Sequence, residues 1–315
     1  MYNYCTLFNS SYLTRGVAMY ESLLSTGADF HLYIFAFDNQ CANVLKALKL
    51  KKITVVTLSE FEDEALLKVK KDRTAGEYCW TCTPSIIDYS IRTFNLENCT
   101  YLDADLYFYS DPAVLIEEMG TNSVLITEHR YLPEYDCTKN AGIYCVQFVT
   151  FKNDAHGMKT LLWWKNACLD WCYARCENGK FGDQKYLDDW PERFDGIHVL
   201  QHPGGGVAPW NLMRYDLDSK AFSLVFYHFQ DLKFLTHEKI ELGRYKFRKT
   251  DIKRLYKPYI RHLESIADKL EPIGNGFDYH GTQKPAKSLL ILYRDFKRWL
   301  EGSYNVYKKS ELLSE

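Results

Sequence analysis

Short apolar runs alternate with amphipathic segments near the start of the chain. Turn-forming residues bound three runs that predict β-strands, at residues 4–8, 30–37 and 53–58. Between them, apolar residues recur three and four positions apart over residues 13–24 and 44–48, and this spacing predicts two helices. Strands that alternate with helices indicate an α/β fold with a mostly parallel central sheet and helices on both faces. Sheets of this kind bind ligands beyond the carboxyl ends of their strands.

The same patterns predict further elements downstream. A helix is expected over residues 85–94, with Pro84 at its opening turn. Two more strands are expected at residues 124–127 and 142–148. A helix rich in aromatic residues is expected at residues 161–176.

The composition excludes several classes of protein. The 315 residues include 24 Tyr, 18 Phe and 7 Trp, which is more aromatic area than a disordered chain carries. No run approaches the roughly twenty apolar residues of a membrane-spanning helix. The N-terminal residues lack the basic and apolar regions of a signal peptide, so we expect a cytoplasmic protein whose 10 cysteines are reduced.

Charge divides the chain into two parts. The formal net charge is -2, yet residues 1–232 carry 21 Lys and Arg against 30 Asp and Glu. Residues 233–309 carry 18 against 9. We therefore expect one domain at residues 1–232 and a basic region at residues 233–315. The acidic part argues against nucleic-acid binding, whereas the basic part suits a surface that carries phosphates.

The most informative residues are Asp103 and Asp105, which follow an apolar run and flank Ala104. In a strand, residues i and i+2 point to the same face, so this spacing would bring both carboxylates together at the mouth of the sheet. The carboxylates repel each other unless a cation lies between them. Mg²⁺ and Mn²⁺ prefer such oxygen ligands and leave positions open for substrate phosphates. The alternative is an ordinary acidic turn at the end of a strand.

This stretch resembles a family motif. Residues 101–105, Tyr-Leu-Asp-Ala-Asp, followed by Ser110-Asp111-Pro112, resemble the Asp-x-Asp motif of the nucleotide-sugar glycosyltransferases of the GT-A fold. They are most similar to the retaining, family 8-like group that includes bacterial lipopolysaccharide galactosyl- and glucosyltransferases and glycogenin. Residues 202–211 resemble a segment of cell-surface polysaccharide transferases. The resemblance covers residues 4–235. Three further motifs follow in the family's order: Asn140-Ala141-Gly142, Gly182-Asp183-Gln184 and Tyr227-His228-Phe229.

The resemblance implies a Rossmann-like GT-A domain that uses Mn²⁺ or Mg²⁺ and a nucleotide-sugar donor, with a UDP-sugar expected. It implies that Asp103, Asp105 and His228 hold the metal. It assigns catalysis to Asp183 and Gln184, with Gln184 beneath the anomeric carbon and Asp183 holding sugar hydroxyls or acting as a base. The residues expected to bind the donor are Thr6, Tyr12, Asp38, Asp103, Ala104, Asp105, Asn140, Gly142 and Lys233.

Three departures from the family pattern concern the donor. Asn9 stands where the family often has Asp, and residues 83–85 occupy the neighbourhood of the family's arginine. The Gly-x-x-Lys-Pro-Trp that usually follows the histidine is replaced by Asp231-Leu232-Lys233, so Lys233 is expected to face the donor phosphates. By position, Tyr12 is still expected to stack on the base, and Asp38 to contact the base or the ribose.

Several of these residues also have structural interpretations. His228 lies between two aromatic residues and would suit a core histidine, while Asp183 would suit a helix N-cap. Gly204-Gly205-Gly206 lacks the ending of a phosphate-binding P-loop and suits either a close approach to a ligand or a tight turn.

The cysteines offer one further alternative, a structural zinc site. Cys79 and Cys82 form a Cys-x-x-Cys pair, and Cys168, Cys172 and Cys176 recur every four residues on a predicted helix. This helical spacing is unlike that of a zinc finger or ribbon, and cysteine is a common small core residue.

The expected function is transfer of a sugar from a UDP-sugar to a surface glycan, such as lipopolysaccharide, or to a lipid-linked acceptor. Retention of configuration follows only from the resemblance. One alternative is a sugar nucleotidyltransferase, which shares the sheet and the metal but usually has a basic, glycine-rich loop after the first strand, where this chain has Phe8-Asn9-Ser10-Ser11. The other alternative is a non-catalytic glycan- or membrane-binding module without metal-dependent nucleotide binding.

The basic region is predicted to be helical at residues 252–270 and 287–300, with breaks at Pro258, Pro272 and Pro285. Its basic residues alternate with aromatic ones, a pattern that suits a membrane interface. We therefore expect peripheral contact with the anionic inner face of a membrane. The alternative is a solvated helical face packed on the catalytic domain.

Overall fold

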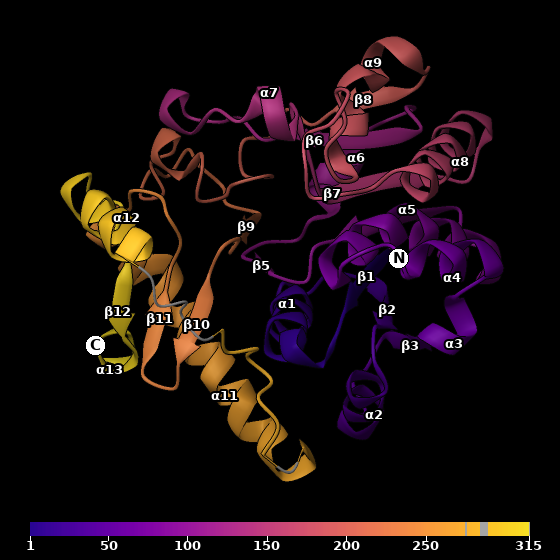
Figure 1. The fold of residues 1–315 in the computed structure, drawn as a ribbon. Helices are drawn as coiled ribbons and strands as arrows, with labels where there is room; N and C mark the ends of the chain where they lie inside the picture. The colour runs from indigo at the N-terminus through magenta and orange to yellow at the C-terminus, as the bar shows by residue number, and fades with distance from the viewer. Residues whose placement is uncertain (275, 284–288, 315) are drawn as a thin grey trace.

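The computed structural model describes residues 1–274, 276–283 and 289–314 and is built around a seven-stranded sheet (Figure 1). The strand order is β3-β2-β1-β4-β7-β6-β8. Neighbouring strands are parallel except at β7, which runs antiparallel to β4 and β6, so the predicted mostly parallel sheet is confirmed. The strands are β1 (Tyr2–Phe8), β2 (Phe30–Ala36), β3 (Ile53–Thr57), β4 (Asn98–Leu102), β6 (Val124–Glu128), β7 (Tyr144–Lys152) and β8 (Ile197–Val199).

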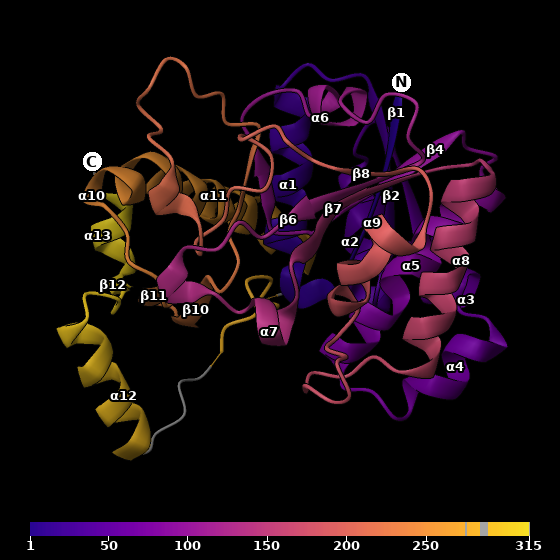
Figure 2. The same cartoon turned by 90° about the horizontal axis from the view of Figure 1, so that it is seen from above.

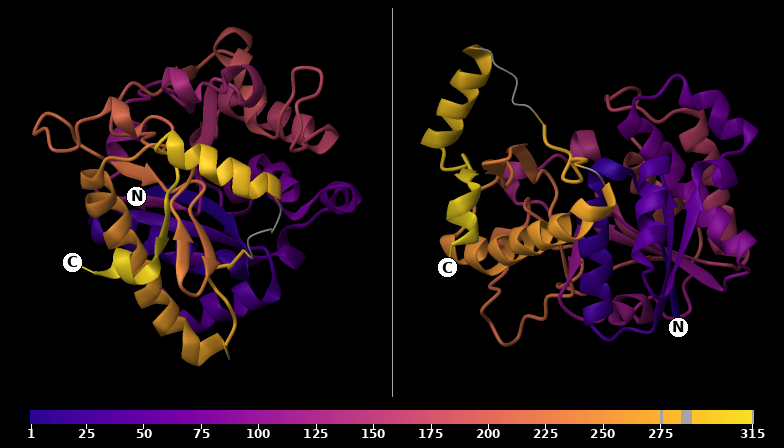
Figure 3. Two further views of the ribbon diagram at one scale, coloured as in Figure 1. Left: turned by 60° about the vertical axis from the view of Figure 1, so that its left-hand side comes forward. Right: turned by 90° about the horizontal axis from the view of Figure 1, so that it is seen from below.

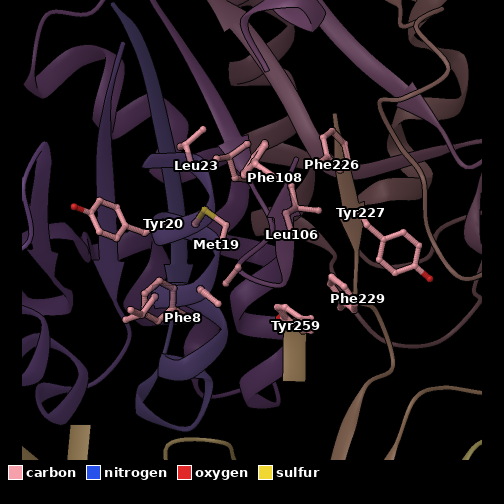
Figure 4. Packing of buried hydrophobic residues seen from close by; sticks show 14 of the residues in the cluster. Phe8, Met19, Tyr20, Leu23, Leu106, Phe108, Phe226, Tyr227, Phe229 and Tyr259 are labelled. Atoms are coloured by element: carbon pink, nitrogen blue, oxygen red, sulfur yellow. The ribbon is translucent and has the colours of Figure 1, made fainter. Parts of the chain in front are cut away.

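One face of the sheet is covered by α1 (Leu13–Ser25), α2 (Asn39–Leu48) and, from the C-terminal region, α11 (Lys257–Gly274) (Figure 2). Their apolar side chains form a single buried cluster with the strands beneath them. This face also holds the short strand β5 (Leu106–Phe108), which packs against α1, and Figure 4 shows Leu23 of α1 next to Phe108. This packing fixes α1 beside the turn that precedes β5.

The other face is covered by α5 (Ala75–Thr93) and α8 (Ala155–Asp170), which pack against each other. Trp164 and Trp190 are the largest fully buried side chains there. Shorter helices extend this layer: α3 (Leu58–Phe61), α4 (Glu64–Lys70) and α9 (Trp190–Arg193).

Two small sheets lie outside the main one. β5 pairs antiparallel with β9 (Phe226–His228). In the C-terminal region, β10 (Lys233–Thr236), β11 (Lys239–Glu241) and β12 (Val306–Lys308) form an antiparallel sheet. Figure 3 shows this sheet and α12 (Leu289–Leu300) at the side of the molecule. The remaining short elements are η1 (Ser10–Tyr12), α6 (Ala113–Glu117), η2 (Pro133–Tyr135), α7 (Thr138–Ala141), η3 (Gln184–Asp189), η4 (Leu212–Arg214), α10 (Lys249–Asp251), η5 (Ile252–Tyr256) and α13 (Lys309–Leu313).

The prediction that a helix opens at Pro84 is wrong, because α5 begins nine residues earlier, at Ala75, and Pro84 lies inside it. The start is set by a capping box in which the backbone N–H groups of Thr74 and Glu77 bond to each other's side chains, at 2.8 and 3.3 Å. A proline inside a helix costs stability because it removes one backbone hydrogen bond. Here the burial of α5 on the sheet and on α8 offsets that cost.

The helix predicted over residues 161–176 is shifted, because α8 runs from Ala155 to Asp170 and the chain becomes extended at Trp171. Cys168 is therefore on the helix, while Cys172 and Cys176 lie beyond it. All ten cysteines are free thiols. Among the described residues, no cysteine belongs to a group placed to hold a metal ion.

The predicted basic helices are present at α11, which continues the π-helical turn η5, and at α12. The predicted breaks at Pro258 and Pro272 are wrong, since both lie within α11. Pro258 comes just after the π-helical turn η5, so it lies within a continuous helical stretch. Pro285 and the predicted helix start at Lys287 lie outside the described residues. Among those that are described, no helix is both long enough and apolar enough to cross a membrane.

Candidate active site

Asp103 and Asp105 lie at the carboxyl end of β4, on the turn that leads into β5. They were predicted to converge because strand side chains alternate, but β4 ends at Leu102 and the pair lies beyond it. The turn is closed by the Leu106 N–H, which donates to the carbonyl of Asp103 at 3.2 Å. The Asp103 N–H donates to the backbone carbonyl of Gln147 in β7 at 3.0 Å, so the turn is attached to the sheet. Turn geometry, rather than strand alternation, brings the carboxylates together.

His228 joins this pair through the pairing of β9 with β5, which sets it opposite Leu106. Its Nε2 atom lies 3.1 Å from Oδ1 of Asp105 and 3.6 Å from Oδ2 of Asp103. One potential ligand atom from each of the three residues falls within 4.8 Å of the others. In the part of the chain that the structure describes, this is the only such group of His, Cys, Asp and Glu side chains.

Each of the three side chains is oriented by a neighbour. Tyr12 donates to Oδ2 of Asp105 at 2.9 Å, and Tyr101 donates to Oδ1 of Asp103 at 2.9 Å. Nδ1 of His228 lies 2.6 Å from the amide oxygen of Gln147. Because that oxygen accepts, Nδ1 carries the hydrogen, and Nε2 faces the two carboxylates.

Electrostatics couple the three groups. Burial would lower the pKa of His228, but the carboxylate of Asp105, a hydrogen bond with Cys145 and the charge of Asp103 raise it well above its usual value. Burial would raise the pKa of Asp105, yet His228 and the hydrogen bond from Tyr12 lower it. Burial raises the pKa of Asp103. A proton on His228 thus offsets one of the two carboxylate charges, and a metal ion would replace that proton, because neutral imidazole is the ligand form.

The cluster fits a hard divalent cation. Adjacent ligands of an octahedral ion with bonds of about 2.1 Å lie about 3 Å apart, close to the separations between Nε2 of His228 and the carboxylate oxygens. Two carboxylates and one imidazole suit Mn²⁺ and leave positions for substrate oxygens. The interpretation of His228 as a purely structural histidine does not explain why two carboxylates converge on its ring.

Asp183 and Gln184 lie on the segment that opens η3. Asp183 is buried at the N-cap position of η3, and its carbonyl accepts a hydrogen bond from the indole of Trp164 at 2.9 Å. Burial and the negative charge of Asp103 raise the pKa of Asp183 to about 7. Asp183 therefore lies close enough to the group of Asp103, Asp105 and His228 to interact with its charge. The amide nitrogen of Gln184 donates to the carbonyl of Ala141 at 2.7 Å.

That contact ties Gln184 to the Asn140-Ala141-Gly142 segment, in which α7 ends and Gly142 is its C-cap. Gly142 adopts φ +105°, and a Cβ atom there would lie 2.9 Å from Oδ1 of Asp188. The same oxygen accepts the N–H of Ile143 at 2.7 Å, so the turn needs glycine both for its backbone and for this close approach. Asn140 is exposed.

Four other predicted residues have the following surroundings. Ala104 is buried between the two aspartates. Thr6 is fully buried in β1, and its hydroxyl has no hydrogen-bond partner. Asp38 caps α2, with one carboxylate oxygen bound to the Cys41 N–H at 2.7 Å and the other bound to the N–H and hydroxyl of Ser10. Lys233 forms an ion pair with Asp231. The roles assigned to these residues in donor binding remain predictions.

The sequence interpretation missed Tyr101, Arg15 and Gln147. Tyr101 stands two residues before Asp103, and Arg15 three residues after Tyr12, so their closeness in the sequence could have pointed to both. The Arg15 guanidinium lies 4.5 Å from the centre of the Tyr12 ring. Gln147 has no local signal, because only the pairing of β7 with β4 brings it near His228.

The segment of residues 202–211 contacts the site through Trp210. The ring of Trp210 meets His228 edge to face at 5.6 Å, and its indole donates to the carbonyl of His129 at 2.7 Å. Asn211 donates to the same carbonyl at 2.8 Å and to that of Gly206 at 2.9 Å. Gly206 has φ +88°, and a Cβ atom there would lie 2.6 Å from Thr127. The three glycines therefore allow close packing within the protein. This favours the structural interpretation, a tight turn, over a close approach to a ligand.

Comparison with solved structures identifies the class of fold. The galactosyltransferase LgtC, solved with donor and acceptor sugar analogues, superposes with a TM-score of 0.54 and 9% identity over 84% of this chain and 95% of its own. The apo form of the glycosyltransferase GlyE of Streptococcus pneumoniae TIGR4 has a TM-score of 0.50 and 12% identity, over 86% of this chain and 63% of its own. The chain has the GT-A fold of these glycosyltransferases, as the Asp-x-Asp resemblance predicted.

Comparison of sequences identifies the family. No protein-family model matches the chain. YfnD of Bacillus subtilis strain 168 is 31% identical over 287 residues, which cover 86% of this chain and 91% of YfnD. YfnF of the same strain is 31% identical over 293 residues, which cover 87% of this chain and 96% of YfnF. Both relatives are described as uncharacterized proteins. The chain belongs to the family that contains YfnD and YfnF.

Proposed function

We propose that the protein is a metal-dependent glycosyltransferase that moves a sugar from a nucleotide diphosphate, a UDP-sugar, to the hydroxyl group of an acceptor. One observation carries the proposal: Asp103, Asp105 and His228 converge at the carboxyl edge of a GT-A sheet, where α/β proteins bind ligands. The donor and acceptor sugar analogues bound to LgtC support a reaction of this class.

In this proposal Asp103, Asp105 and His228 would hold Mn²⁺ or Mg²⁺, and the bound ion would offset the negative charge that develops on the departing diphosphate. Tyr12 and Tyr101 hold the two carboxylates in position through their hydrogen bonds. The other donor contacts come from residues near that edge, with Asn140 and Gly142 on the sugar side and Lys233 toward the phosphates. At the nucleotide end of the proposed donor site, the residues that line the site or support it are Thr6, Asp38 and Ala104.

Two residues act on the sugar itself. The amide nitrogen of Gln184 donates to the carbonyl of Ala141, and in this proposal its amide oxygen is the atom beneath the anomeric carbon. Asp183 binds a sugar hydroxyl, and its pKa of about 7 lets it hold or release a proton near neutral pH. We propose retention of configuration, as in the family 8-like group.

Residues 1–232 form the catalytic domain in this proposal, and residues 233–315 bring it to its acceptor. The acceptor is a surface glycan, such as lipopolysaccharide, or a lipid-linked sugar. The excess of basic residues after residue 232 supports contact with the anionic cytoplasmic face of a membrane, where such acceptors are built.

A product assay tests the proposal. The full chain is incubated with a panel of nucleotide-sugars, with and without Mn²⁺, and the released nucleotide is identified. We expect release of a nucleoside diphosphate that requires the metal. Release of pyrophosphate from a nucleoside triphosphate and a sugar phosphate would instead identify a sugar nucleotidyltransferase. Absence of both turnover and metal-dependent nucleotide binding would leave a non-catalytic binding module.

A further inference from the structure

The helix α12 turns its apolar side outward. Six of its large apolar side chains are between 58% and 81% exposed. Apart from Met1, the next most exposed large apolar side chain among the described residues is Leu67, at 48%. The six are Leu290, Leu292, Tyr293, Phe296, Trp299 and Leu300. A surface helix ordinarily does the reverse and buries its apolar stripe against the core.

The polar side of α12 faces the protein. Arg298 is buried, and its Nη2 atom lies 2.7 Å from Oε1 of Glu241 on β11. The same nitrogen donates to the carbonyls of Gly243 and Ser303 at 3.2 Å each. Asp295, one turn earlier, lies 3.5 Å from Nη1 of Arg298. These contacts fix the rotation of the helix about its axis, so the outward apolar face is a built feature of the fold.

We propose that this face of α12 docks on an anionic lipid surface, with the helix lying in the plane of the surface. Twelve residues span only about 18 Å, too short to cross a bilayer of about 30 Å. The exposed set combines leucines with Tyr293, Phe296 and Trp299, and Trp and Tyr favour the boundary between headgroups and acyl chains. This inference deepens the membrane contact included in the proposed function, on which it rests.

Charge decides in favour of anionic lipid. Arg294 and Lys297 are exposed on α12 itself. A cavity of about 740 Å³ between α12 and the β10–β11 hairpin is lined by Lys233, Lys239, Arg244 and Arg294, with Glu238 among them. Its other two acidic residues, Glu241 and Asp295, are paired with Arg298 inside the fold. A second copy of the chain docked symmetrically on this face would bring the same basic residues together, whereas anionic headgroups would neutralise them.

Vesicle sedimentation tests this proposal on the full chain, without metal or nucleotide-sugar. One set of vesicles is phosphatidylcholine, and the other is an equimolar mixture with phosphatidylglycerol. We expect binding to the anionic vesicles that weakens at high salt. The double variant Phe296→Ser/Trp299→Ser should bind at least about tenfold more weakly, because both side chains are exposed and their loss removes apolar area without disturbing the core. Arg294→Glu/Lys297→Glu should also weaken binding, on anionic vesicles only.

The matched control is Leu24→Ser/Leu67→Ser, which removes two exposed apolar side chains from α1 and α4 and should bind like the parent protein. Unchanged binding of the Phe296/Trp299 variant, or equal binding of the parent to both kinds of vesicle, would overturn the proposal. A third outcome would also overturn it: the parent binds no vesicles and is a dimer, and the Phe296/Trp299 variant is a monomer. Nucleotide release, measured on the same preparations without vesicles, is expected to persist in the α12 variants. Vesicle binding therefore tests the docking face of α12, whereas nucleotide release tests the proposed glycosyltransferase activity, and either can fail without the other.

Discussion

The phenol of Tyr12 donates a hydrogen bond of 2.9 Å to Oδ2 of Asp105. It connects the residue that precedes α1 with the turn after β4, and it leaves the other oxygen of Asp105 toward His228. Arg15 supports the arrangement, because its guanidinium lies over the Tyr12 ring and donates to the carbonyls of Leu232 and His280. The C-terminal region is thus connected to the candidate metal site through two side chains.

Replacing Tyr12 by Phe should weaken Mn²⁺ binding while leaving the fold intact. The variant keeps the ring beneath Arg15 but frees the Asp105 carboxylate to rotate, and partners of this kind contribute about 10–100-fold to metal affinity. Titration calorimetry with Mn²⁺ measures the effect. Tyr20→Phe is the control, because that hydroxyl binds the carbonyl of Lys51 elsewhere on α1. Equal Mn²⁺ affinities for Tyr12→Phe and the parent would contradict the proposed role.

Replacing Asp103 or Asp105 by Asn should abolish metal-dependent nucleotide release. Each change removes a charged ligand, so the loss should exceed the roughly 10–100-fold that outer partners contribute. Circular dichroism confirms folding, and nucleotide release is followed across a Mn²⁺ series. Asp111→Asn is the matched control, since Asp111 is exposed in the segment after β5. Activity of the folded double variant at the level of the parent would refute a metal site at this turn.

Asp183→Asn should stabilise the protein at alkaline pH. Burial raises the pKa of Asp183 to about 7, whereas an unfolded chain has an aspartate pKa of about 3.9. The native state therefore binds this proton more tightly, and stability falls as the pH rises from about 4 to about 7. Asparagine does not ionise, so the variant avoids this loss. Its free energy of unfolding should exceed that of the parent by roughly 2–4 kcal/mol at pH 8 and by little at pH 4.

Thermal melts of the parent and of Asp183→Asn across this pH range measure the difference in stability between the two proteins. Asp195→Asn, at an exposed aspartate, should leave the melting curve unchanged at every pH. The stabilised variant should also lose nucleotide release if Asp183 acts on the sugar. A stability gap that does not vary with pH would show that Asp183 is not protonated in the fold.

Replacing Arg15 by Met should lower both stability and Mn²⁺ affinity. The buried carbonyls of Leu232 and His280 would lose a charged donor, at a cost of about 2 kcal/mol, and Tyr12 would lose the support for its ring. Arg92→Met is the control, because its ion pair with Asp88 is exposed on the arginine side and contributes little. Lower stability with unchanged Mn²⁺ affinity would limit Arg15 to a structural role.

Local patterns predicted much of the fold. The short apolar runs of β1 to β3 and the spacing of three and four in α1 and α2 are local properties of the chain, so those elements appear where they were expected. The start of α5 was missed because packing on the sheet outweighs the local effect of Pro84. In the same way, α8 ends at Asp170 although apolar residues continue beyond it.

The order of the family motifs was enough to nominate Asp103, Asp105 and His228, because a motif is a local property of the chain. Their convergence depends on the pairing of β5 with β9, and the orientation of the histidine depends on Gln147 of β7, a long-range contact without any local signal. The same holds for α12. Its amphipathic pattern predicts a helix with one apolar face, but the direction of that face follows from the ion pair between Arg298 and Glu241, which only the folded chain brings together.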